Sequence, residues 1–166
     1  AWQQHRIARL VVQKLFGTVT GKRIAILGFA FKSDTNDTRE SPAIRICKDL
    51  LLEGAVLNIY DPKVSEIQIS TELEYINESQ HLPQLQSWSL CDSINQACIG
   101  ADAVVLLTEW SCFSKLQWKE IAKIMRKPGW VFDCRCLLTP AEINSHGLNF
   151  WRVGLMQSRA EIHATE

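Results

Sequence analysis

The chain has 166 residues, of which 46% are hydrophobic, and its 18 lysines and arginines balance its 18 aspartates and glutamates. This composition is that of a globular protein long enough to bury a full core. Balanced charge predicts no general attraction to nucleic acid or to an acidic membrane surface. Polar and basic residues interrupt the apolar pattern of residues 1–16, which predicts neither a secretory signal nor a membrane span, so we expect a soluble, cytoplasmic protein.

The N-terminal segment is predicted to be an amphipathic helix. Ile7, Leu10, Val11 and Leu15 recur at helical spacing, and the helix is expected to end near Gly17. Because an apolar stripe of this kind usually marks an interface, we expect it to pack on its own domain or on a second chain.

A βαβ unit is predicted next. Its expected elements are a strand over 22–27, a helix over 41–52 with Pro42 at its first position, and a strand over 56–60. Gly54 is expected at the C-cap of the helix. The polar stretch 65–86 predicts no more than a short helix, within an irregular excursion that follows Asp61.

The second half of the chain continues the alternation. The expected elements are a strand over 88–90, a helix capped by Asp92 or Ser93 and running through Ile99, a strand over 103–107, a helix over 116–125, a strand over 130–132, a turn of helix after Thr139 and Pro140, and a strand over 148–153. Strands that alternate with helices imply a parallel sheet. The predicted fold class is therefore α/β, a Rossmann-like parallel sheet with helices on both faces, preceded by an N-terminal helix. Residues 155–166 are expected to form a frayed polar tail.

The six cysteines lack the spacing of a small disulfide scaffold, and most lie in apolar elements. We therefore expect reduced thiols. Cys134 and Cys136 form the one pair that resembles metal ligands, but no second pair and no nearby histidine completes a set of four. No metal site is predicted.

The turn after the first predicted strand departs from the pattern of a dinucleotide-binding fold. The apolar run over 24–27 ends at Gly28, but no second glycine follows, and Phe29, Phe31 and Lys32 stand where a pyrophosphate would approach bare backbone. The G-x-G-x-x-G fingerprint occurs nowhere in the chain. This turn is therefore expected to hold something other than a dinucleotide.

Polar residues follow each predicted strand at its carboxyl end, where ligands bind in parallel sheets. These segments are 28–39, 61–63, 108–110 and 133–135. Lys63 is interpreted as a solvated charge. Arg135 is interpreted as functional, because it lies between two cysteines directly after a predicted buried strand. Glu109 has no paired acid that would indicate proton transfer, so it is interpreted as structural or near the site.

The blocks GFAFKSDTNDTRESPA, NIYDPKV, LLTEW and VFDCR resemble, in this order, the signature blocks of the UDP-glucose dehydrogenase family, within the wider UDP-glucose/GDP-mannose dehydrogenases. The resemblance is to the C-terminal part of those enzymes. It implies that residues 17–154 form a UDP-binding domain and that residues 1–16 are the end of the central helix that joins the two halves and helps form the dimer. It also implies a fragment of a homo-oligomeric, NAD-dependent enzyme that oxidises UDP-glucose to UDP-glucuronate.

The resemblance also implies roles for four residues. Phe31 and Lys32 would contact the UDP-sugar, and Arg135 of the F-D-x-R element would bind the substrate, although Cys134 stands where family members often have glycine. Arg39, in the D-x-R-x-S pattern, would reach toward NAD held mainly by a domain outside this chain. A lysine or a guanidinium can meet a phosphate directly, without close approach of backbone amides. A core aromatic remains an alternative for Phe31, and a capping or salt-bridge arginine remains one for Arg39.

No catalytic residue is predicted in this chain. In the family a cysteine in a glycine-rich loop is the nucleophile, and none of the six cysteines here has that setting. The chain alone is expected to bind nucleotide weakly or not at all, and to oxidise nothing. Two alternatives stay open: a free-standing, non-catalytic nucleotide-binding or assembly module, and a domain of a GDP-mannose or UDP-N-acetylhexosamine dehydrogenase.

Overall fold

The computed structural model describes residues 2–73 and 87–154. Within them six strands form one sheet: β1 Arg23–Leu27, β2 Val56–Tyr60, β3 Trp88–Leu90, β4 Ala103–Leu106, β5 Trp130–Asp133 and β6 Asn149–Arg152. Every neighbouring pair is parallel, in the order β3-β2-β1-β4-β5-β6. This is the strand order of the doubly wound dinucleotide-binding fold. The chain adds β2 and β3 on one side of β1 and then β4, β5 and β6 on the other, so the strand order reverses between β1 and β4. The predicted fold class is confirmed.

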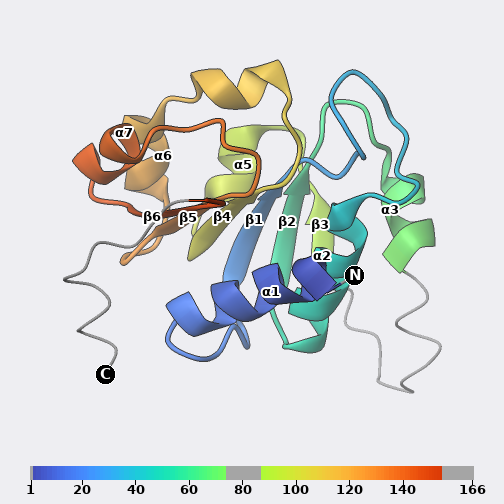
Figure 1. Ribbon diagram of the computed structural model, residues 1–166, viewed down its shortest axis with the longest axis horizontal. Coiled ribbons are helices and arrows are strands. Elements are labelled where there is room, and N and C mark those ends of the chain that lie inside the picture. Colours follow the sequence, from blue (N-terminus) through green and yellow to red (C-terminus); the bar gives the residue numbers. More distant parts are fainter. Residues whose placement is uncertain (1, 74–86, 155–166) are drawn as a thin grey trace.

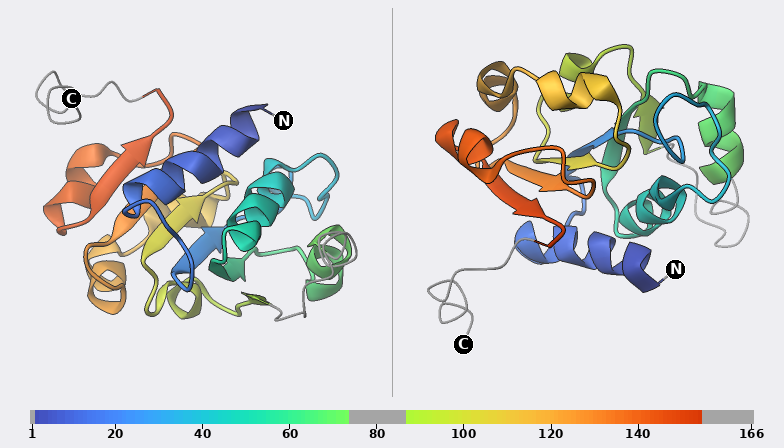
Figure 2. Two further views of the ribbon diagram at one scale, coloured as in Figure 1. Left: turned by 90° about the horizontal axis from the view of Figure 1, so that it is seen from below. Right: turned by 45° about the horizontal axis from the view of Figure 1, so that its top comes forward.

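Helices cover both faces of the sheet (Figure 1). They are α1 Trp2–Lys14, α2 Pro42–Leu52, α3 Glu66–Leu73, α5 Ile94–Cys98, α6 Trp118–Ile124 and α7 Pro140–Ser145, with a 3₁₀ helix, η1, over Ser111–Lys115. Figure 2 shows α1 and α2 side by side across one face, with α6 and η1 on the other side of the sheet. In the part of the chain that the structure describes, no helix is long and apolar enough to cross a membrane.

Most predicted boundaries differ from the observed ones by no more than one residue, and the start of α6 is an exception. The helix expected over 116–125 begins at Trp118, because Leu116 and Gln117 leave helical geometry between η1 and α6. Gly54 follows the C-cap, which is Glu53. The short helix expected within 65–86 is α3, whereas residues 74–86 and the predicted tail over 155–166 lie outside the described residues.

The two central strands, β1 and β4, lie in the core. All four residues of β4 and the last four of β1 are buried, as continuous apolar runs are in a parallel sheet with both faces covered. Burial on both faces fixes the strands rigidly, so the segments that leave their carboxyl ends start from well-defined positions.

The helix α1 packs on the domain that follows it. Val11 and Leu15 are buried, and Ile7 and Leu10 are half-buried against the core. The imidazole of His5 lies 2.7 Å from the carboxylate of Asp49 on α2. The expectation that the apolar face of this helix packs against protein is therefore confirmed within this chain, while its assignment to a longer connecting helix stays a prediction.

Candidate functional site

The candidate site is the edge of the sheet where β1, β2, β4 and β5 end, which lies uppermost in Figure 1. In a doubly wound sheet, ligands bind outside the carboxyl ends of the strands beside the switch point. All four polar segments identified in the sequence begin at this edge, because each follows one of these strands.

A carboxylate from β2 fills the turn that follows β1. The backbone amides of Phe29 and Ala30 donate hydrogen bonds to Oδ2 of Asp61 at 2.8 and 3.0 Å. The indole nitrogen of Trp110 donates to the same oxygen at 3.3 Å. Asp61 is only 6% exposed, so these bonds replace the water that its charge would otherwise hold.

The second oxygen of the same carboxylate is also satisfied. Oδ1 of Asp61 accepts from the backbone amides of Lys63 and Val64 at 2.9 and 3.1 Å. Five donors therefore surround one buried side chain and join the segments that follow β1, β2 and β4. A buried charge needs hydrogen-bond partners of this kind, and here the partners also fix the shape of the site edge.

The residues of this turn do not fit NAD in the manner of a dinucleotide-binding fold. In that fold the amides after the first strand face a pyrophosphate, and an acidic residue at the end of the second strand binds a ribose. Here the amides of Phe29 and Ala30 already bind Asp61, and Phe29 itself is fully buried. In place of a pyrophosphate, this turn therefore holds the chain's own carboxylate.

Gly28 is the one glycine that this turn requires. Its φ is +96°, and a Cβ there would lie 2.4 Å from Cβ and Oγ1 of Thr108. Thr108, at the end of the β4 segment, is fully buried and donates to the carbonyl of Ala30 at 2.9 Å. The segments after β1 and β4 are thus in direct contact at the switch point.

The two predicted sugar-binding residues lie on the loop beyond this anchored turn. Phe31 is 45% exposed, which excludes the alternative of a core aromatic, and its backbone amide donates to the carbonyl of Asp37 at 2.8 Å. Lys32 is exposed and makes no hydrogen bond or ion pair with any described residue. One apolar side chain and one cation that makes no hydrogen bond or ion pair with the described residues therefore project from a short segment whose base is fixed.

Arg39 forms a local ion pair at the far end of the same loop. Its Nε and Nη2 donate to Oδ1 and Oδ2 of Asp37 at 3.1 and 3.0 Å. These hydrogen bonds hold the pKa of Asp37 below its usual value and raise the pKa of Arg39. The salt-bridge alternative for Arg39 is therefore observed, but its side chain is 85% exposed and faces solvent. A contact with NAD stays a prediction.

Arg135 is held more firmly than Arg39. Its Nε and Nη2 donate to Oε2 of Glu109 at 3.1 and 2.8 Å, and its side chain is 29% exposed. Its backbone amide donates to Oδ1 of the fully buried Asp133 at 2.9 Å, while Oδ2 accepts from Leu138 at 2.8 Å. Cys134 beside it is no nucleophile, because burial raises its pKa to about 12.

The structure connects the predicted residues through the segment after β4. Thr108 binds the turn that leads to Phe31 and Lys32, and the next residue, Glu109, binds Arg135. The structural role of Asp61 was missed from the sequence. Glu109 was interpreted as structural or near the site, but its pairing with Arg135 was not predicted. The signal available for Asp61 was an acidic residue placed directly after an apolar strand. That Lys32 and Arg135 converge on one crevice stays a prediction.

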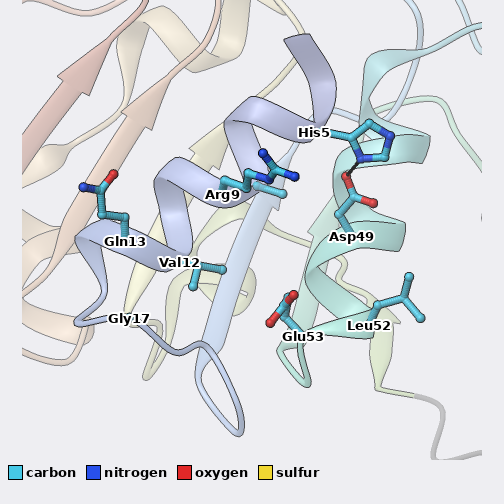
Figure 3. Close-up of a pocket in the computed structure, with 9 residues that line it drawn as sticks. His5, Arg9, Val12, Gln13, Gly17, Asp49, Leu52 and Glu53 are labelled. Atoms are coloured by element: carbon cyan, nitrogen blue, oxygen red, sulfur yellow. Dashed lines mark hydrogen bonds and ion pairs between the residues drawn. The ribbon is translucent and has the colours of Figure 1, made fainter. Parts of the chain in front are cut away.

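A separate groove of about 480 Å³ lies between α1 and α2 (Figure 3). The ionisable side chains in its lining are His5, Arg9, Asp49 and Glu53, and none of the predicted site residues belongs to it. It is removed from the strand ends, so it is not the ligand site indicated by the fold. Within residues 2–73 and 87–154, no group of three or more His, Cys, Asp or Glu side chains is arranged to hold a metal ion.

The sheet order and the polar switch-point edge define a Rossmann-like α/β domain. Residues 25–140 match the model of the UDP-glucose/GDP-mannose dehydrogenase family, UDP binding domain. The chain therefore belongs to the UDP-glucose/GDP-mannose dehydrogenase family and carries its UDP-binding domain.

Named relatives agree with this assignment. The chain is 47% identical to UDP-glucose 6-dehydrogenase of Bos taurus over 82% of its length, and 42% identical to that of Mus musculus over 99%. It spans only 28% and 34% of those two proteins. A UDP-D-ManNAc dehydrogenase from Pyrococcus horikoshii has a TM-score of 0.67 at 25% identity, with 90% of this chain and 30% of that one covered. An NDP-N-acetyl-D-galactosaminuronic acid dehydrogenase from Methanosarcina mazei has the same fold, with a TM-score of 0.71 at 23% identity over 92% of this chain and 28% of that one.

Proposed function

We propose that this chain is the UDP-sugar-binding domain of an NAD-dependent UDP-glucose 6-dehydrogenase. In the complete enzyme, UDP-glucose would be oxidised to UDP-glucuronate with NAD as the cofactor, and the enzyme would act as a homo-oligomer. The observation that carries the proposal is the pairing of a family UDP-binding match with a loop that presents Phe31 and the cation Lys32 at the switch-point edge.

Each residue has a distinct part in the proposed site. The ammonium of Lys32 would meet the diphosphate or a sugar oxygen, and the exposed ring of Phe31 would contact the nucleotide sugar through its apolar face. The guanidinium of Arg135 would donate to a phosphate oxygen, since such pairs are among the strong hydrogen bonds. Arg39, exposed at the far end of the loop, would turn toward NAD bound elsewhere.

The residues of this chain supply binding and orientation in the proposal, and the chemistry of oxidation lies outside it. Burial raises the pKa of Cys47 and of Cys98, so neither thiol is poised as a nucleophile. NAD supplies hydride acceptance when bound. The turn after β1 does not fit that cofactor, so Arg39 is the one group here assigned to it.

A second candidate is a dehydrogenase for a UDP-N-acetylhexosamine. It is favoured by the fold shared with the solved Pyrococcus protein, which is named a UDP-D-ManNAc dehydrogenase. The higher identity to UDP-glucose 6-dehydrogenases favours the first candidate.

Calorimetric titration of the natural polypeptide that carries this chain tests the proposal. We expect UDP-glucose to bind more tightly than UDP-N-acetylglucosamine or GDP-mannose, and UDP-glucose with NAD to yield NADH. Preference for the acetylated sugar would support the second candidate. Binding of nucleotide without NADH formation would instead indicate a non-catalytic module.

A further inference from the structure

We propose that Glu109 is a positioning residue, which orients the guanidinium of Arg135 toward the anionic part of the UDP-sugar. The inference rests on the proposed function, since it adds Glu109 to the residues of the proposed UDP-sugar site. It starts from the ion pair in which Nε and Nη2 of Arg135 both donate to Oε2 of Glu109, at 3.1 and 2.8 Å.

The main chain on both sides of Glu109 is anchored. Thr108, immediately before it, is fully buried and donates to the carbonyl of Ala30. Trp110, immediately after it, is 5% exposed and donates to Asp61. The Glu109 side chain therefore leaves a segment that cannot shift without breaking buried hydrogen bonds, which gives its carboxylate a defined position.

The main chain of Arg135 is anchored independently. The buried carboxylate of Asp133 accepts hydrogen bonds from the backbone amides of Arg135 and Leu138, and these two bonds fix the bend after β5. With both backbones fixed, the bond to Glu109 decides where the guanidinium lies. A side chain that reaches its ligand in one prepared rotamer loses less entropy on binding than one that must be ordered.

The ion pair with Glu109 uses only one edge of the Arg135 guanidinium. Glu109 takes the Nε and Nη2 edge, and Nη1 of Arg135 makes no hydrogen bond with any described residue. A planar guanidinium can donate on one edge to a carboxylate and on the other to a phosphate.

The other surface pair at this edge shows what a purely local ion pair looks like. Asp37 and Arg39 are two positions apart, and the arginine side chain is 85% exposed. Glu109 and Arg135 are 26 positions apart, come from neighbouring strands, and leave the arginine only 29% exposed. A carboxylate beside a diphosphate site weakens anion binding by charge repulsion, so its presence on an anchored segment points to a compensating role.

The test compares variants of the natural polypeptide, with UDP-glucose affinity measured by calorimetry. Glu109→Ala removes the acceptor, and we expect affinity to fall roughly threefold to tenfold, the effect of one or two hydrogen bonds. Glu109→Gln keeps an acceptor oxygen, and we expect affinity within about twofold of the unaltered protein. Glu120→Ala, which removes an exposed glutamate paired with Lys123 on α6, is the matched control and should change nothing.

Arg135→Ala separates failure of the inference from failure of the proposed function. If Arg135→Ala leaves UDP-glucose affinity unchanged, the assignment of this site fails, and the inference with it. If Arg135→Ala weakens binding, Glu109→Ala added to it should cause no further loss. Additive losses would overturn the inference, as would Glu109→Ala binding as tightly as or more tightly than the unaltered protein, or equal loss in Glu109→Gln.

Discussion

Oδ2 of Asp61 lies 2.8 Å from the backbone nitrogen of Phe29, which places a carboxylate from the second strand inside the turn after the first. In related folds that turn receives a phosphate from outside. Here the anion is covalently part of the chain, so the turn is rigid before any ligand arrives. In the proposed site, the ligand would instead meet the side chains of the loop beyond this turn.

The first prediction concerns Asp61→Asn. Each oxygen of Asp61 accepts at least two hydrogen bonds, whereas asparagine has one acceptor oxygen, so two or more N–H groups, at least one of them buried, would lose their partner. Because one buried unpaired donor costs about 1–3 kcal/mol, we expect the free energy of unfolding to fall by at least about 1 kcal/mol.

Urea denaturation measures this change. Asp92→Asn is the control, since Asp92 also follows a strand but is exposed, and its effect should stay within about 0.5 kcal/mol. Equal, small effects of the two substitutions would show that the buried carboxylate does not stabilise the turn.

The second prediction concerns Gly28→Ala. The new Cβ would meet Thr108 at 2.4 Å, and the backbone would keep a φ of +96°, so both steric overlap and strain oppose the substitution. We expect a loss of stability well above 1 kcal/mol, measured by thermal or urea unfolding. Gly147→Ala isolates the strain, because Gly147 has a φ of +79° and nothing within 4 Å of the added atom. Gly28→Ala should therefore cost clearly more, and an equal cost would contradict the contact with Thr108.

The third prediction separates the two ligands. Lys32→Ala in the natural polypeptide should weaken UDP-sugar binding by about 1.5–3 kcal/mol, the value of a hydrogen bond to a charged group, with little change for NAD. Arg39→Ala should do the reverse. Both side chains are exposed, so folding should be unaffected. Calorimetry with each ligand is the measurement, and equal loss of both ligands in both variants would falsify this division of roles.

The fourth prediction is a loss of stability in alkaline solution. Burial raises the pKa of Cys98 from 9.0 to about 12. The folded state therefore keeps this proton at pH values where the unfolded state releases it, and the free energy of unfolding should fall as pH rises from about 9 toward 12. Cys98→Ala should flatten this part of the pH profile, measured by denaturation at each pH. Cys136→Ala, which removes an exposed thiol, is the control, and identical profiles in the two variants would contradict the burial effect at Cys98.

The sequence predicts the sheet well because its strands are short apolar runs bounded by turn residues. The strands β2 and β3 have the predicted bounds, and β1 and β5 differ from them by one residue. The 3₁₀ helix η1 could not be predicted, since Ser111–Lys115 has no apolar repeat and its geometry depends on the buried ring of Phe113.

The candidate site was predicted less completely. The resemblance to family blocks predicted the cations Lys32 and Arg135. It did not predict the hydrogen bonds that shape the site, because these join positions far apart in the chain. The bond from Phe29 to Asp61 spans 32 positions and that from Arg135 to Glu109 spans 26. The position of an acidic residue after an apolar strand marks both as candidates, but it does not distinguish a buried or paired carboxylate from a solvated one. Only the parallel pairing of the strands brings them beside their donors.

The filled turn makes the ligand preference of this domain hard to reverse. Removing the Asp61 carboxylate would release the amides of Phe29 and Ala30 for a ligand. It would also leave the N–H groups of Lys63, Val64 and Trp110 without their acceptor. Replacing Phe29 with glycine would empty a fully buried position and leave a cavity in the core. Every single step toward a dinucleotide cradle therefore costs stability before it yields any binding. The buried interior of the domain, rather than the exposed loop, therefore opposes a change toward a dinucleotide-binding turn.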